Sequence, residues 1–282
     1  MTRRQGSRNP VADILGRLKD DLNALIETTS ANQPSATARR QLDAELRALI
    51  TRADALLRDL DPIHYPHFMF DPGDPAVVGR FIALAMIAQP RVPLSAVERF
   101  YGSGIYALYY KGDFPAYVPI SGTETPIYVG KADPQSDTAK TSMEQGDRLS
   151  NRLKDHLRNI RKAEDTLNVA DFECRSLVVQ SGWQGAAEDY LIHLFRPVWN
   201  NETDICYGLG KHGDDPSTRA NLRSPWDTLH PGRDWAWRDP NMGDARPRDK
   251  ILADLGEHFS TGTIYRDLDQ ILKGFIDELR QL

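Results

Sequence analysis

The sequence predicts an α+β protein, with a small mixed or antiparallel three-stranded sheet flanked by helices. Three runs rich in β-branched and aromatic residues, bounded by Gly, Pro or polar turns, indicate strands at 104–110, 126–131 and 172–180. Two runs with apolar residues at helical spacing, 147–160 and 183–195, indicate the helices that cover the sheet. Helical residues precede this core, and a loop region followed by a helix succeeds it.

The N-terminal part has the pattern of two helices between residues 11 and 60. Apolar residues recur at four-residue spacing in two stretches, and a polar segment that contains Pro34 separates them. The positions are Ile14, Leu18, Leu22, Ile26, Leu42, Leu46, Ile50 and Leu57. We expect an αα-hairpin. Its role is open between a DNA clamp, an oligomer contact and a scaffold, and a scaffold is the default.

The chain between this hairpin and the first strand begins with a Pro- and Asp-rich linker at 62–75. A short helix is expected at 76–88, and a second is expected to start with Ser95 as its N-cap and run towards Phe100. The predicted organisation has four parts: a hairpin at 1–62, a linker with short helices at 63–99, a core at 100–201 and a C-terminal extension at 202–282.

The C-terminal extension is rich in Gly, Pro, Asp and Trp up to about Arg248. Three tryptophans, at 226, 235 and 237, alternate there with basic and acidic residues. Aromatic and basic residues in this arrangement favour nucleic-acid contact, but a packed irregular region accounts for them equally well. A final amphipathic helix is expected at 264–282.

Composition places few limits on function. The chain has 282 residues and a formal net charge of −5, and its segment 146–162 holds six basic and two acidic residues, so a local DNA-binding surface is compatible with the acidic total. Cys174 and Cys206 are expected to be free thiols, and no metal-binding His or Cys spacing is present. No signal peptide or membrane-length apolar run appears, so we expect a cytoplasmic protein without membrane contact.

Each of the first two strands carries a tyrosine that is a candidate for chemistry. Side chains alternate along a strand, so Tyr106 shares a face with Leu108 and Tyr110, while Tyr128 shares a face with Gly130. If the strands pair, two phenols lie side by side. Two core tyrosines with satisfied hydroxyls are the alternative. The connection at 111–125 is longer than a common hairpin loop, so the pairing register stays open.

Two helices carry the charged residues that are candidates for chemistry. In 147–160 a stripe of Leu149, Leu153, Leu157 and Ile160 adjoins a row formed by Arg148, Arg152 and His156. A solvated basic stripe is the alternative. Glu188 lies among apolar neighbours in the second helix. One interpretation is an ordinary solvated carboxylate on the helix surface. If Glu188 instead faces the sheet, its buried charge needs a cation, and a metal ion is one candidate.

These elements together resemble the GIY-YIG nuclease superfamily over residues 100–201. The elements are GIY at 104–106, YVG at 128–130, an Arg-bearing helix, a helical Glu and a later Asn. Three further features resemble its type II restriction endonuclease branch: a His four residues after the Arg, the Glu-to-Asn spacing, and the Phe100-Tyr101-Gly102 lead-in. The most similar members of that branch cut CCGCGG, which is therefore the expected site.

The resemblance implies roles for individual residues. Glu188 matches the single carboxylate ligand of a divalent metal, Mg²⁺ or Mn²⁺, and Arg152 matches the arginine that contacts the scissile phosphate. Tyr106 matches the general base, assisted by His156, with Tyr128 in the same cluster. Lys131 is a further candidate for the base. Asn200, or Asn201 beside it, matches a supporting asparagine. The basic helix offers DNA contacts through Arg148, Lys154 and Arg158.

The expected function is a type II endonuclease that cuts double-stranded DNA at a short palindrome. A palindromic site favours a homodimer or homotetramer, and a restriction enzyme is paired with a cognate DNA methyltransferase. One alternative is a repair or mobile-element nuclease of the same superfamily, which would carry separate DNA-binding modules. A second is a non-catalytic DNA-binding protein on the same scaffold, which would be free to lose the chemical residues retained here.

Overall fold

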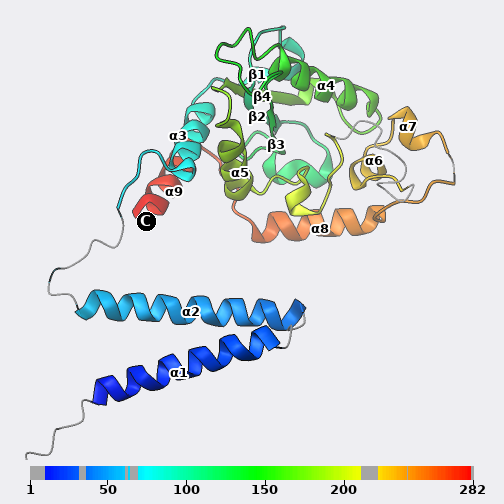
Figure 1. Cartoon of the computed structure of the whole chain (residues 1–282). Coiled ribbons are helices and arrows are strands. Elements are labelled where there is room, and N and C mark those ends of the chain that lie inside the picture. The colour runs from blue at the N-terminus through cyan, green and yellow to red at the C-terminus, as the bar shows by residue number, and fades with distance from the viewer. Residues whose placement is uncertain are drawn as a thin grey trace, which may run out of the picture. The chain divides into compact units, whose positions relative to one another are not determined.

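The computed structural model describes residues 10–31, 36–60, 63, 69–210, 222–239 and 241–280. The chain divides into two compact units, residues 1–69 and 70–282. In the first unit, the described residues form two long helices, α1 (Pro10–Ala31) and α2 (Ala36–Leu60) (Figure 1). The two helices of the expected hairpin are therefore present, whereas residues 32–35 between them and residues 62 and 64–68 of the expected linker lie outside those described.

The apolar stripes of the hairpin remain largely in contact with solvent. No residue of α1 is buried, and large side chains on both helices are about half exposed or more. They are Val11, Ile14, Leu15, Leu18, Leu22, Ile26, Leu49, Ile50, Leu56, Leu57 and Leu60. An apolar surface of this extent is typical of a segment that packs against a further partner.

The second unit is built on a four-stranded antiparallel sheet in the order β1-β4-β2-β3. Its strands are β1 (Val92–Pro93), β2 (Gly104–Tyr110), β3 (Tyr128–Ala132) and β4 (Phe172–Val178). The antiparallel α+β prediction is confirmed. The prediction of three strands was wrong, because it missed the short edge strand β1. Strand β3 also begins two residues later than expected.

The helix expected to start at Ser95 is also absent. Val92 pairs with Cys174 of β4 as an edge strand, and a single 3₁₀ turn follows at Leu94–Ala96. Proline favours an extended conformation in the residue before it, which suits Val92 to strand pairing. Leu94 is fully buried in the core, and the N-cap position of the turn is occupied by Pro93, not by Ser95.

The two faces of β2 pack against different helices. Tyr106, Leu108 and Tyr110 belong to one buried cluster with the leucines of α4 (Arg148–Lys162), as the alternation predicted. The intervening residues belong to a second cluster with α3 (Pro75–Ile87), α5 (Gln184–Phe195) and α9 (Leu268–Arg280). Figure 1 shows α3, α5 and α9 on the side of the sheet opposite α4.

The described residues of the C-terminal extension include helices packed on the core. It contains α6 (Pro225–Leu229), α7 (Asp234–Trp237) and α8 (Arg248–Thr261), and α8 was not predicted. Only Ile251 and Leu255 of α8 are buried, and Gly256 interrupts its pattern, so its sequence gives a weak helical signal. Trp226 is fully buried beside Trp199, which makes it a core residue.

The cysteines and the apolar character of the helices were also subjects of prediction. Cys174 and Cys206 are both buried free thiols, as expected. Within the described ranges, no helix has the length and apolar character that a bilayer span requires.

Candidate active site

The pairing of β2 with β3 places the two signature tyrosines together. Tyr106 lies opposite Gly130 and Leu108 opposite Tyr128, which settles the register that the long connection left open. The two phenol rings are 6.0 Å apart between centroids. A Cβ atom on residue 130 would lie 2.6 Å from the Tyr106 Oη, so glycine is required there for the phenol to cross the neighbouring strand.

Helix α4 adds a histidine and an arginine to the tyrosine pair. His156 is buried, and its Nε2 is hydrogen-bonded to the Tyr106 Oη at 2.6 Å. The His156 ring also lies 5.0 Å from the Tyr128 ring, so the three rings form one cluster. Arg152, one turn earlier, interacts with both phenol hydroxyls. The alternative of a wholly solvated basic stripe therefore does not hold for these two residues.

The electrostatics of this cluster keep the phenols protonated and the guanidinium charged. Burial, with a further contribution from Tyr128, raises the pKa of Tyr106 well above its usual value, and Arg152 only partly opposes this. Burial likewise raises the pKa of Tyr128. Burial lowers the pKa of Arg152, but the two phenols outweigh it and the net shift is upward. Neither phenol supplies a free phenolate at neutral pH.

Glu188 projects from α5 into a cavity of about 260 Å³ beside Tyr128 and Arg152. Its side chain is 18% exposed, and the Lys131 Nζ lies 3.9 Å from its Oε2. Burial raises the pKa of Glu188 to about 7, although Lys131 acts in the opposite direction. The carboxylate is therefore partly desolvated and incompletely neutralised, a setting in which a bound cation would stabilise its ionised form.

The edge position of β3 explains how residues from both faces of the sheet reach one site. Tyr128 and Gly130 point to the α4 side, whereas Lys131 points to the α5 side and meets Glu188. Because β3 is the last strand, the cavity extends around its free edge. A central strand would separate the two groups.

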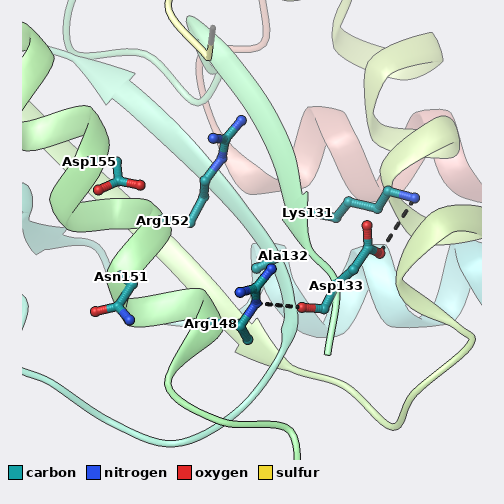
Figure 2. Close-up of a pocket in the computed structure, with 7 residues that line it drawn as sticks. All are labelled: Lys131, Ala132, Asp133, Arg148, Asn151, Arg152 and Asp155. Atoms are coloured by element: carbon teal, nitrogen blue, oxygen red, sulfur yellow. Dashed lines mark hydrogen bonds and ion pairs between the residues drawn. The ribbon is translucent and has the colours of Figure 1, made fainter. Parts of the chain in front are cut away.

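A second cavity, of about 330 Å³, lies on the other side of Arg152. It is lined by Lys131, Ala132, Asp133, Arg148, Asn151, Arg152 and Asp155 (Figure 2). The Arg148 Nε donates to the Asp133 carbonyl oxygen at 3.2 Å, and the Lys131 Nζ lies 3.6 Å from the Asp133 Oδ1. In Figure 2 the Arg152 side chain extends away from Arg148, so the two guanidinium groups occupy separate regions.

Asn200 holds the edge strand in place. Its Oδ1 accepts from the Val129 amide at 2.9 Å, and its Nδ2 donates to the Val129 carbonyl at 2.8 Å. The side-chain amide thus replaces the peptide group of a neighbouring strand along an otherwise unpaired edge. Asn201 is exposed and begins a 3₁₀ turn, so the predicted supporting asparagine corresponds geometrically to Asn200.

Two of the predicted DNA contacts lie outside both cavities. Arg158 forms an ion pair with Asp155, and Lys154 lines neither cavity. Tyr106 also lines neither and has no exposed surface, whereas Tyr128 lines the Glu188 cavity. Tyr128 is therefore the phenol in contact with the cavity, and Tyr106 lies behind it.

The prediction missed a wall of the site that the C-terminal extension contributes. Gly208 and Gly210 line the Glu188 cavity, together with Asp189 and Glu202. A Cβ atom on residue 210 would lie 2.9 Å from the Arg152 Nη2, so this segment contacts the Arg152 guanidinium directly. A Gly-Leu-Gly stretch after the supporting asparagine was the available sequence signal.

The donor set of the Glu188 cavity fits a hard divalent cation. Three carboxylates line it, but within the described part of the chain no three His, Cys, Asp or Glu side chains converge as a complete metal cage. Mg²⁺ commonly binds through one or two carboxylates and retains several waters, so an incomplete protein shell suits it. The raised pKa of Glu188 agrees with a carboxylate that lacks a full counter-charge.

Comparison with known proteins places this arrangement in a family. The family model described as the Eco29kI GIY-YIG domain matches residues 98–259, which is more than half of the chain. The match includes strands β2, β3 and β4, the helix with Arg152 and the extension as far as residue 259, which supplies Gly210. No curated protein gives a significant match. With its paired tyrosines, arginine, glutamate and edge-strand asparagine in one site, the chain belongs to the Eco29kI family of GIY-YIG restriction endonucleases.

Proposed function

We propose that the protein is a metal-dependent type II endonuclease that hydrolyses double-stranded DNA at a short, GC-rich palindrome, with CCGCGG as the expected site. The observation that carries the proposed chemistry is the convergence of Arg152, Tyr128 and Glu188 on one cavity of about 260 Å³. A cation for the phosphate, hydroxyls near a water site and a carboxylate for a metal are the components that phosphodiester hydrolysis requires.

Glu188 would hold the divalent metal, Mg²⁺ or Mn²⁺, with water and phosphate oxygens completing its shell. When bound, such an ion neutralises negative charge that develops on the phosphate and the leaving oxygen. Lys131, 3.9 Å from the same carboxylate, keeps positive charge near it before the ion arrives. Asp189 and Glu202 line the same cavity and would orient metal-bound water.

Arg152 would bind the scissile phosphate. Its guanidinium stays charged because the neighbouring phenols raise its pKa, and it lies between the two cavities. A guanidinium pairs with two phosphate oxygens through parallel hydrogen bonds, which fixes the phosphorus for attack. Arg148 in the second cavity, and Lys154 and Arg158 further along α4, would contact neighbouring phosphates.

The proton of the attacking water would pass to the Tyr106–His156 pair. The high pKa of Tyr106 opposes a free phenolate, so the step requires a relay. Because Tyr106 does not line the cavity, the proton would reach it through the hydroxyl of Tyr128. Tyr128 would accept the proton from water and pass its own to the Tyr106 Oη, whose proton moves along the 2.6 Å hydrogen bond to the His156 Nε2. No phenolate forms in this sequence, and the histidine carries the positive charge. Tyr128, which lines the cavity, orients the water. Lys131 remains the second candidate for the base because it lines the second cavity and its Nζ lies 3.9 Å from the Glu188 Oε2.

The protein would act as a homodimer or homotetramer, since each strand of a palindrome needs its own active site. The exposed leucine stripes of α1 and α2 support self-association through the hairpin. A restriction role also implies a cognate DNA methyltransferase. A repair or mobile-element nuclease is the alternative within the superfamily, and a non-catalytic DNA-binding protein is the alternative outside enzymes.

The test is digestion of plasmid DNA by the native protein and by Glu188→Ala, with Mg²⁺ and with EDTA. Discrete fragments that require both the metal and Glu188, with ends sharing one sequence, would support the proposal and identify the site. Scattered ends would exclude the restriction assignment. Intact DNA with every divalent metal would favour the binding protein.

A further inference from the structure

The segment Gly208–Gly210 contacts the two groups proposed to face the phosphate. Its glycines line the Glu188 cavity. A Cβ atom on residue 210 would lie 2.9 Å from the Arg152 Nη2 and 3.1 Å from the Tyr128 Oη. Gly210 has no left-handed φ, so the crowding concerns these two side chains and not backbone strain. Only hydrogen at this position lets the segment approach the guanidinium this closely.

A buried ion pair in the C-terminal extension holds this segment from behind. Arg233 is 1% exposed; its Nη2 donates to the Gly208 carbonyl at 2.9 Å and its Nη1 to the Leu209 carbonyl at 3.3 Å. Asp227 is fully buried and accepts from the Arg233 Nε at 2.7 Å and from Nη2 at 2.8 Å. The Arg233 guanidinium also lies over the Trp226 ring, 4.7 Å from its centroid.

Stability alone does not explain why the buried Arg233–Asp227 ion pair is present. Removing two charges from water costs several kcal/mol per ion, so a buried pair often stabilises a fold no better than apolar side chains would. Here the arginine instead gives directional donors to two consecutive carbonyls, which apolar residues cannot do. Asn159 of α4 donates to the same Leu209 carbonyl at 3.2 Å, so the segment is also tied to the helix that carries Arg152.

We propose that Arg233 and Asp227 are positioning residues for phosphodiester hydrolysis. Through the carbonyls of Gly208 and Leu209 they fix Gly210 against the Arg152 guanidinium, which limits its rotation and presents its plane to the scissile phosphate. Bidentate binding depends on that orientation, and small misplacements of a binding group reduce rates steeply. This inference rests on the proposed nuclease function, because it assigns Arg152 to the phosphate.

The first test is Gly210→Ala, compared with Gly256→Ala in the exposed part of α8, where an added Cβ meets nothing within 4 Å. Single-turnover cleavage by Gly210→Ala should fall about 10-fold to 100-fold, a range expected for misplacement near the reacting atoms. Its urea unfolding midpoint should stay at the wild-type value, and its DNA affinity in Ca²⁺ should stay within about 3-fold. Gly256→Ala should cut at the wild-type rate.

The second test links the buried pair to the same segment. Arg233→Lys keeps the charge beside Asp227 but lacks the second arm that reaches a carbonyl. We expect a loss of cleavage similar to that of Gly210→Ala, and a double variant no worse than the slower single variant, since both act on the orientation of Arg152. Additive losses, or cleavage that falls only with the folded fraction, would mean that Arg233 is merely structural and would overturn the proposal.

The outcomes separate this inference from the function on which it rests. A native protein that cuts no DNA removes the nuclease proposal itself. A native protein that cuts, together with a Gly210→Ala variant that cuts equally fast, removes only the positioning role. If Arg233→Lys does not fold, the result for Gly210→Ala decides alone.

Discussion

Replacing Glu188 with glutamine should stabilise the metal-free protein at high pH while it abolishes cleavage. The carboxyl is largely buried, and its pKa rises from the ordinary 4.5 to about 7. The folded protein therefore retains this proton to higher pH than the unfolded chain does. The stability contributed by the proton is complete below pH 4.5 and is lost as the pH rises to about 7.

The size of the effect follows from the pKa. The difference between 4.5 and about 7 corresponds to about 3 kcal/mol against folding once Glu188 is ionised in both states. This value is an upper limit, because the side chain keeps 18% exposure and solvent screens part of the interaction. Glutamine has nearly the same shape and carries no charge, so Glu188→Gln should recover part of that free energy at pH 8 and little at pH 5.

The assay is urea unfolding of both proteins in EDTA at pH 5 and pH 8, followed by the same series in excess Mg²⁺. In EDTA the variant should have the higher midpoint at pH 8. In Mg²⁺ the wild type alone should gain stability, because a ligand stabilises only the state that binds it. Glu257→Gln, which changes an exposed carboxylate on α8 that lines neither cavity, is the matched control. A variant less stable than wild type at pH 8 in EDTA would refute the account of Glu188 as a desolvated, under-neutralised carboxylate.

Three further predictions concern the remaining residues of the site. Arg152→Ala should reduce single-turnover cleavage by about 100-fold or more with DNA binding in Ca²⁺ largely retained, because the missing contact is made to the reacting phosphate; equal loss of both would leave Arg152 as an anchor only. Tyr106→Phe should slow cleavage more than Tyr128→Phe if the hydrogen bond to the histidine relays the proton; the reverse order in a pH–rate series would assign the base to Tyr128. Asn200→Ala should lower the free energy of unfolding by about 1–3 kcal/mol, since it leaves two backbone groups of the edge strand unpaired; Asn201→Ala, on the exposed neighbour, should change it little in the same urea titration.

The parts of the fold that follow a local pattern were predictable from the sequence. The alternation along 104–110 identified which side chains face α4, and the 3.6-residue period of 147–160 set Arg152 and His156 on one face. The pattern did not show that His156 is buried. That depends on the Tyr106 hydroxyl, which reaches the histidine from a strand 50 residues earlier.

The parts that depend on tertiary contacts were not predictable in this way. The edge strand β1 has only two residues, too few for any period, and exists because β4 offers it a pairing edge. The Gly208–Gly210 wall is held by the guanidinium of Arg233, which lies 25 residues after Gly208 and 24 after Leu209. The tryptophan-rich region suggested nucleic-acid contact, but its Trp226 instead packs beside that guanidinium.

The edge strand β3 brings these separate requirements together. A nuclease site needs a cation for phosphate and a carboxylate for metal within reach of each other, yet side chains on opposite faces of a sheet are kept apart by its backbone. At a free edge the two faces meet, so Tyr128 from one side and Glu188 from the other line one cavity, with Lys131 3.9 Å from the Glu188 carboxylate. A free edge is also liable to pair with other strands. Asn200 prevents such pairing at Val129 by occupying both of its backbone groups. The Gly208–Gly210 wall, held by Arg233, covers the site near Tyr128. The C-terminal extension therefore protects the edge strand, so that this strand can carry an active site.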